Sequence, residues 1–278
     1  MKALSPILAH WRAEPSRTWS LIVTLFGDAI VPRGGAVWLG TLLEFFRALD
    51  INDGVVRTAT SRLASDGWLE RNRVGRNSFY RLADKGRDEF REAALRIYAR
   101  RAPLWAGRFD LAIGGDRTAL EAAGFAVVAP GVWAAPGGAA AIEGALRLQA
   151  SGDAATNRAL AARCWPLEAT GAAYLSFLKA FQPLHDALAQ DAAFTDLEAF
   201  AARILLIHEY RRIVLRDPCL PLELLPEDWP GNAARTLCAS IYVRVAAASE
   251  RWLDATAIGE DGAPLPARLQ VIARRFAD

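Results

Sequence analysis

The stretch VRTATSRLASDGWLERNRVGRNSFYRL, residues Val56–Leu82, carries six arginines and begins with the spacing of an amphipathic helix. Val56, Ala59 and Leu63 stand at i, i+3 and i+7, so they share one helix face that we expect to be buried. Gly67 predicts the end of this helix, because glycine readily adopts the left-handed conformation of the C′ position. The arginines of the stretch therefore lie either on the outer faces of a helix or beyond its end.

A hairpin is predicted directly after that helix. Trp68–Val74 and Ser78–Leu82 read as two short strands, and Gly75-Arg76-Asn77 between them reads as the tip of a tight turn. A helix followed by a basic hairpin is typical of a winged helix. This interpretation requires further helices upstream.

The upstream sequence predicts those helices. A first helix ends near Gly27-Asp28, Val37-Trp38 reads as a short strand, and Thr41 is the expected N-cap of a second helix. Asp53 is the expected N-cap of the third, which runs to about Asp66, so only a short turn separates the last two helices. This is the helix-turn-helix layout, with the third helix as the recognition helix.

Charge is distributed unevenly along the chain. Residues 1–103 contain 17 Lys and Arg against 11 Asp and Glu, whereas residues 104–278 contain 16 against 20. Such asymmetry indicates a polyanionic partner at the N-terminal end. We therefore expect double-stranded DNA to bind there, the alternative being a small helical domain with a solvated basic face.

The residue types and positions predict which side chains contact DNA. The candidates for groove contacts on the recognition helix are Arg57, Thr58, Ser61 and Arg62. The candidates on the hairpin are Arg73, Arg76 and Asn77, with Arg76 placed to reach a phosphate or the minor groove.

Motifs for catalysis, metals and cofactors are missing. Neither phosphate-loop glycine pattern occurs, and the three histidines and three cysteines lack the spacing of a metal site. We accordingly expect no catalytic residues, no metal and no cofactor. The early charges exclude a signal peptide and no apolar run has transmembrane length, so we expect a cytoplasmic protein.

The middle of the chain, residues 104–169, predicts a small α+β module. Strands are expected over Trp105–Ile113, Phe125–Val128 and Gly131–Ala135, with a short helix over Arg117–Ala123 after the first. A helix over Ala139–Ala150 and a last strand over Arg163–Leu167 would complete the order β-α-β-β-α-β, which is ferredoxin-like.

Residues 170–278 predict helices: Tyr174–Ala189, Ala193–Arg216, Ala233–Ala255 and a short one near Pro266–Ala277. His208 and Arg211 fall on the apolar stripe of the second, where an arginine needs a partner because an isolated charge is costly in low dielectric. Two readings are open for Arg211. It can form a structural ion pair with Asp217 or Glu168, or it can line an anion-binding pocket.

Four segments resemble the PaaX family of transcriptional repressors of phenylacetic acid degradation. They are SRTWSLIVTLFGD, RGGAVWLGTLLEFF, VRTATSRLASDGWLERNRVGRNSFYRLADKG and LLIHEYRRIVLRDPCLPLELLPEDWPG (Leu205–Gly231). The resemblance implies a repressor that senses phenylacetyl-CoA or a related aromatic acyl-CoA, and it implies an α+β module in the middle of the chain. Candidates for contacts to this effector are Trp165, Tyr174, His208, Arg211, Arg212, Arg216 and Trp229.

Together these observations predict an α+β protein in three parts. They are a winged helix over residues 16–90, a ferredoxin-like module for dimerisation or packing over 104–169, and a helical domain over 170–278 that binds the effector. The expected protein is a homodimeric, non-enzymatic repressor that releases operator DNA when the acyl-CoA binds. The alternative is an acyl-CoA-binding protein or enzyme whose basic N-terminal unit makes another contact.

Overall fold

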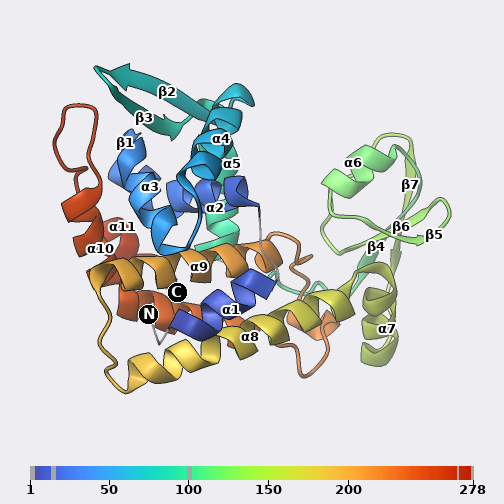
Figure 1. Ribbon diagram of the computed structural model, residues 1–278. Coiled ribbons are helices and arrows are strands. Elements are labelled where there is room, and N and C mark those ends of the chain that lie inside the picture. The colour runs from blue at the N-terminus through green and yellow to red at the C-terminus, as the bar shows by residue number, and fades with distance from the viewer. Residues whose placement is uncertain (1–3, 14–16, 99–101, 268, 277–278) are drawn as a thin grey trace. The chain divides into compact units, whose positions relative to one another are not determined.

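Helices and two small antiparallel sheets build this chain, as expected for an α+β protein (Figure 1). The computed structural model describes residues 4–13, 17–98, 102–267 and 269–276. The elements form two compact units: Met1–Ala99 with Ser176–Leu215 and Ala233–Asp278, and Arg100–Leu175 with Arg216–Asn232. The segment expected to form the winged helix thus packs in one unit with most of the C-terminal helices.

The first unit begins with helical segments that run further than expected. They are α1 (Ser5–Ala13), α2 (Thr18–Leu25), a π-helical segment over Phe26–Ile30 and a 3-10 turn over Val31–Arg33. The α-helix α2 ends at Leu25, close to the predicted end near Gly27-Asp28, but the chain continues as π- and 3-10 helix until Gly34, with φ +75°. Asp28 and Arg33 are both buried, and their partners are distant in sequence, so local sequence did not indicate this continuation.

Two helices and a three-stranded sheet follow. They are β1 (Val37–Trp38), α3 (Leu39–Ala48), α4 (Asp53–Ser65), β2 (Leu69–Val74) and β3 (Asn77–Leu82). The sheet is antiparallel with the order β1-β3-β2, and α4 packs against α2, α3 and β2. In Figure 1 the β2–β3 hairpin lies at the top of the view, and the long helix α5 (Asp84–Tyr98) follows it.

The structure corrects two predicted helix caps. Trp38 is the N-cap of α3, and Thr41 lies inside that helix, where its hydroxyl donates a hydrogen bond to the backbone oxygen of Thr256. Asn52, not Asp53, caps α4, because its side-chain oxygen accepts the backbone N–H of Gly54 at 2.8 Å. The N-cap of α3 thus lies three residues earlier than expected, and the N-cap of α4 one residue earlier.

The C-terminal helices agree with the expectation within a few residues, except that the first of them begins at Leu167 and not at Tyr174. They are α8 (Leu167–Ala189), α9 (Asp196–Val214), α10 (Gly231–Thr256) and α11 (Leu269–Ala273). Helix α9 begins with a capping box between Thr195 and Glu198 and is buried along most of its length. Three N-terminal helices of this unit, α2, α3 and α5, pack against α9 (Figure 1).

The second unit contains a four-stranded antiparallel sheet in the order β5-β6-β4-β7. Its elements are β4 (Phe109–Gly114), α6 (Arg117–Ala122), β5 (Ala126–Ala129), β6 (Val132–Pro136), β7 (Ala145–Ala150), α7 (Ala154–Cys164) and a 3-10 turn over Leu222–Leu224. Leu120 of α6 packs with Ala112 and Trp133, while Ala161 of α7 belongs to a separate cluster with Phe109 and Ala134. The two helices therefore cover opposite faces of the sheet.

Two predictions for this unit are wrong. Ala145–Ala150 is strand β7, paired with Phe109–Gly114, although Ala139–Ala150 was expected to be helical. Arg163–Leu167 is not a strand, because α7 continues to Cys164 and α8 begins at Leu167. The observed order is therefore β-α-β-β-β-α, and the second crossover helix of the predicted ferredoxin-like module is missing.

Candidate nucleic-acid interface

Helix α4 presents most of the side chains that the sequence predicted for groove contacts. Val56, Thr60 and Leu63 are buried, so they define its inner face, and Ala59 is only partly buried. The four predicted contact residues of this helix are all exposed: Arg57, Thr58, Ser61 and Arg62. The structure thus places them on the outer side of α4 within one turn or two of each other.

Both ends of α4 are set by local backbone conformation. Asp50, with φ +59°, turns the chain between α3 and α4, and Asp53 in the first turn of α4 forms an ion pair with Arg47 of α3. The hydrogen bond from Arg47 lowers the pKa of the Asp53 carboxyl below its ordinary value. At the other end Gly67 has φ +74°, which confirms the left-handed residue predicted there.

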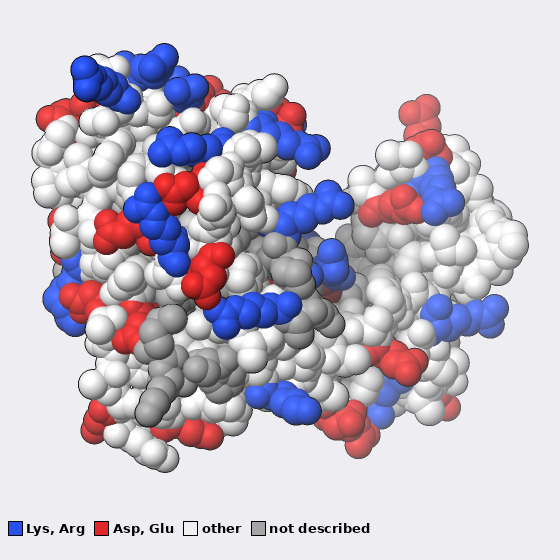
Figure 2. Space-filling view, in the orientation of Figure 1, with Lys and Arg blue, Asp and Glu red and all other residues white. Residues whose placement is uncertain are grey.

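The β2–β3 hairpin has the two-residue turn Gly75-Arg76 at its tip. Val74 pairs with Asn77, and Gly75, with φ +59°, is the only one of the two turn residues with a positive φ, as in a type II′ turn. Arg73, Arg76 and Asn77 are all exposed. Figure 2 shows Lys and Arg side chains gathered at the top of this unit, where Figure 1 places the hairpin.

Arg71 is a further basic residue of the hairpin that the sequence reasoning did not select. Directly opposite residues of an antiparallel pair share a face, so Arg71 lies on the same face as Tyr80, and Arg73 on the same face as Ser78. Alternation along β2 places both arginines on the face of buried Leu69. The alternation Leu69-x-Arg71-x-Arg73 could have indicated from sequence that Arg71 shares one face of the hairpin with Arg73.

Several polar groups of this surface already have intramolecular partners. The Thr58 hydroxyl donates to the backbone oxygen of Gly54 at 2.9 Å, and Arg71 donates to the hydroxyl of Ser78 at 2.9 Å. Arg62 Nε lies 3.6 Å from Asp66, with both side chains mostly exposed, so this pair is weak and easily exchanged for a phosphate.

The predicted effector contacts are divided between the two units. Trp165, Tyr174, Arg216 and Trp229 belong to the second unit. There the buried Tyr174 hydroxyl donates to Asp217 at 2.7 Å, and the Tyr174 ring meets Trp229 edge-on at 5.9 Å. Arg216 is exposed and Trp165 is buried, so these four side chains differ widely in access to a ligand.

His208, Arg211 and Arg212 belong to the first unit. His208 is fully buried with its Nδ1 2.8 Å from the Thr24 hydroxyl, and burial, together with Arg211 and Arg212, lowers its pKa to about 3. Arg211 donates to the backbone and side-chain oxygens of Ser20, and burial lowers its pKa to about 10. Asp217 and Glu168 lie in the second unit, so the predicted pairing of Arg211 with one of them stays a prediction.

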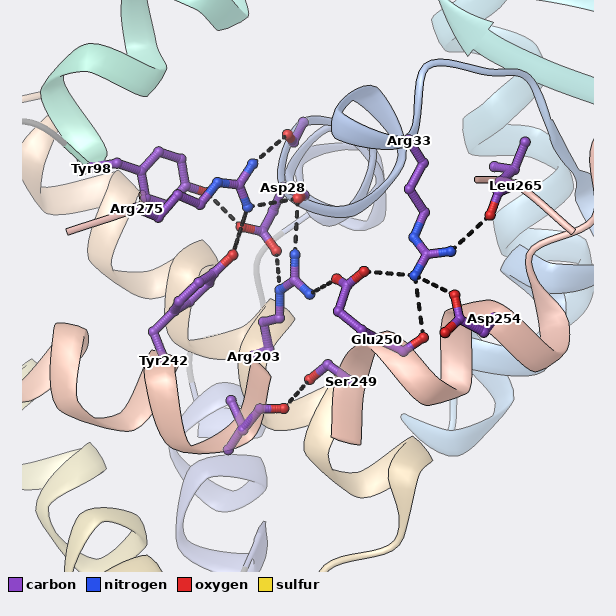
Figure 3. Close-up of polar contacts among 12 residues, drawn as sticks. Asp28, Arg33, Tyr98, Arg203, Tyr242, Ser249, Glu250, Asp254, Leu265 and Arg275 are labelled. Carbon is purple, nitrogen blue, oxygen red and sulfur yellow. Dashed lines mark hydrogen bonds and ion pairs between the residues drawn. The ribbon is translucent and has the colours of Figure 1, made fainter. Parts of the chain in front are cut away.

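A buried network of charged residues supports the first unit, and the sequence reasoning missed it (Figure 3). Arg203 of α9 joins two acids, because its Nε donates to Asp28 at 2.6 Å and its Nη1 to Glu250 at 2.5 Å. Arg275 donates to Asp28 at 2.5 Å, and Arg33 donates to Glu250 at 2.6 Å. Arginines on otherwise buried helix faces were the signal that could have revealed it.

This network connects the N-terminal helices with the C-terminal ones. Asp28 also accepts the hydroxyls of Tyr98 at 2.6 Å and Tyr242 at 3.1 Å. Burial by itself raises the pKa of Asp28, but Arg203 and Arg275 outweigh it and hold that pKa below its ordinary value. The π-helical segment and the 3-10 turn that precede β1 are therefore tied to α9, α10 and Arg275 by paired charges.

Neither a metal centre nor a membrane span emerges from the described part of the chain. No group of three or more His, Cys, Asp and Glu side chains there is arranged to hold a metal ion. Among the helices that the structure describes, none is long and apolar enough to cross a bilayer.

Comparison with known proteins matches two separate segments of the chain to one family. Residues 17–86 match the family "PaaX-like protein", and residues 165–255 match "PaaX-like protein C-terminal domain". The chain is similar to the protein named Transcriptional repressor PaaX of Escherichia coli (strain K12). The two are 38% identical over an alignment of 293 positions, which covers 95% of this chain and 93% of that one.

A solved structure shows a similar fold. It is that of an uncharacterized protein from Mycobacterium tuberculosis, with a TM-score of 0.54, 24% identity and coverage of 87% of this chain and 98% of that one. At this identity the likeness concerns the fold alone.

Proposed function

Because the chain belongs to the PaaX-like family, we propose that it is a transcriptional repressor of phenylacetic acid degradation genes that binds operator DNA through a winged helix. One observation carries the proposal. Residues 17–86, which match the family, are also the residues that build α2, α3, α4 and the β2–β3 hairpin, whose basic side chains are exposed.

In this proposal α4 is the recognition helix and the hairpin is the wing. The major groove admits an α-helix, and its base edges are read by side chains such as those of Arg57, Thr58, Ser61 and Arg62. At the wing tip Gly75 carries no side chain, so Arg76 can approach the DNA backbone closely, with Arg73 and Asn77 beside it. The wing then supplies phosphate or minor-groove contacts, while α4 supplies base contacts.

A homodimer would place two copies of α4 on a palindromic operator. Recognition helices of such dimers lie one helical turn of DNA apart, about 34–36 Å, or a multiple of it. We propose residues 104–169 as the dimerisation or packing module.

The proposed effector is phenylacetyl-CoA or a related aromatic acyl-CoA, and residues 170–278 are its candidate binding domain. The phosphates of such a thioester suit Arg211, Arg212 and Arg216, and its aromatic group suits Trp165, Tyr174 or Trp229. The support is the resemblance of Leu205–Gly231 to the family signature. A ligand of this kind releases DNA only if it binds the DNA-incompetent arrangement more tightly.

Two measurements test the proposal. Gel shifts on random duplex DNA at two salt concentrations should show binding that weakens steeply with salt, as phosphate contacts require. The melting temperature should rise with phenylacetyl-CoA, because a ligand at 100 times its Kd adds about 2.7 kcal/mol. Coenzyme A alone is the control. A chain that binds the thioester but no DNA would instead be an acyl-CoA-binding protein or enzyme.

A further inference from the structure

One exposed apolar residue of helix α4, Val55, is not among the candidate DNA contacts. Val55 stands in the first turn of the helix, and 49% of its surface is exposed. The other exposed residues of α4 are small or polar: Gly54, Arg57, Thr58, Ser61, Arg62 and Ser65. The structure describes every residue of α4. Among them, Val55 is the only aliphatic side chain classed as exposed.

The apolar surface at Val55 continues onto α2. Thr18 and Trp19, at the start of α2, line a shallow groove together with Val55, Ala59 and Arg62 of α4. Trp19 is 38% exposed, so a large apolar surface faces outward beside Val55. The groove is thus lined mainly by apolar side chains, with the cationic side chain of Arg62 among them.

Thr58 adds to the apolar character of the same stripe. Its hydroxyl proton is used within the helix, in the hydrogen bond to the Gly54 oxygen at 2.9 Å. The groups that Thr58 still offers to a ligand are an acceptor oxygen and a methyl group. Since Val55, Thr58 and Arg62 follow each other at i, i+3 and i+7, apolar and cationic groups share one line along the helix.

The major groove of DNA contains one apolar group that such a line can recognise. It is the 5-methyl group of thymine, which cytosine and uracil lack, and the N-terminal residues of a recognition helix are the ones that meet base edges. Resting on the proposed DNA binding, we infer that Val55 contacts a thymine methyl group and selects thymine at one position of each operator half-site. Trp19 forms the wall of the groove that holds this contact.

Charge favours DNA over a protein partner as the occupant. Arg57 and Arg62 are exposed on the same helix, and Arg71, Arg73 and Arg76 are exposed on the adjacent hairpin. An apolar surface of this size surrounded by arginines suits a polyanion with a few methyl groups, whereas the core of a protein interface is depleted in charge.

The experiment begins with operators selected by the wild-type protein from a random duplex pool. Each selected thymine is then replaced by deoxyuridine, which removes only the methyl group. We expect wild-type affinity to fall by about three- to fivefold at one thymine per half-site, the factor that corresponds to one buried methyl group. Val55→Ala should bind the thymine operator more weakly by a similar factor and should no longer distinguish thymine from deoxyuridine there.

Val243→Ala is the matched control, because Val243 is an exposed valine of α10, with 67% of its surface accessible. It should keep the full deoxyuridine penalty. If the wild type selects no duplex, the proposed function itself fails. If it selects an operator but no deoxyuridine weakens binding, or if Val55→Ala keeps the penalty, the assignment of Val55 is overturned while the proposed function stands.

Discussion

Replacing Arg203 by methionine removes the side chain that joins two buried carboxylates. Arg203 is fully buried and donates three hydrogen bonds: Nε to Asp28 Oδ2 at 2.6 Å, Nη2 to the Asp28 backbone oxygen at 3.1 Å, and Nη1 to Glu250 at 2.5 Å. Methionine fills much of the same volume without charge. The variant therefore isolates the electrostatic role of the guanidinium from its packing role.

The expected loss of stability follows from what each acid retains. Removing one partner of a buried ion pair costs about 3–5 kcal/mol. Asp28 keeps Arg275 and the Tyr98 hydroxyl, and Glu250 keeps Arg33 at 2.6 Å, so we expect the lower end of that range. At about 2–4 °C per kcal/mol, the melting temperature should fall by about 6–12 °C.

The loss should also depend on pH. Arg203 and Arg275 lower the folded-state pKa of Asp28 against the opposing effect of burial, so this carboxylate contributes stability above the unfolded pKa that disappears as the pH falls through the folded value. Without Arg203 the pKa of Asp28 rises, so this carboxylate, which has lost one of its two arginines, becomes protonated at a higher pH than in the wild type. The difference between variant and wild type should be complete at pH 7 and shrink below about pH 4, the ordinary range of an aspartate.

Urea unfolding and thermal melts at several pH values measure this difference. Arg251→Met is the matched control, because Arg251 pairs with Asp196 at the surface, with side chains 61% and 40% exposed, and such pairs contribute about 0–1 kcal/mol. The reasoning is refuted if Arg203→Met is no less stable than Arg251→Met, or if the loss grows on acidification.

Three further predictions concern binding. Arg57→Ala and Arg62→Ala should each weaken operator binding by about 1–3 kcal/mol in gel shifts, and equal losses on random DNA would reassign them to phosphate positioning. Arg76→Ala should weaken binding to all duplexes and reduce the salt slope by about one unit, so an unchanged slope would remove the wing tip from the interface. Arg211→Ala should keep DNA binding but lose release by phenylacetyl-CoA. Calorimetry with a thermal melt tests this, because normal ligand affinity with a lowered melting temperature would leave Arg211 a structural role through Ser20.

The elements of the candidate interface could be predicted from sequence because short-range signals determine them. Gly67 and Gly75 occupy positive φ, Val56 and Leu63 are buried at helical spacing, and the exposed positions of α4 follow from that period. Each of these features depends on residues within one or two turns. For the same reason the cap of α3 was misplaced by only three residues and the cap of α4 by one.

Strand pairs and ion pairs between residues far apart in the chain could not be predicted from such short-range signals. Ala145–Ala150 has a helix-favouring composition but forms a strand, since its hydrogen bonds go to β4, more than 30 residues earlier in the chain. Asp28 and Arg203 are 175 residues apart, and neither position indicates by itself that a buried charge will be neutralised there. The groove between Trp19 and Val55 likewise exists only where α2 and α4 pack together. Local sequence determines backbone conformation over a few residues, whereas the partners of buried charges and strand edges are chosen by the packing of the whole chain, because only burial makes an unpaired group costly.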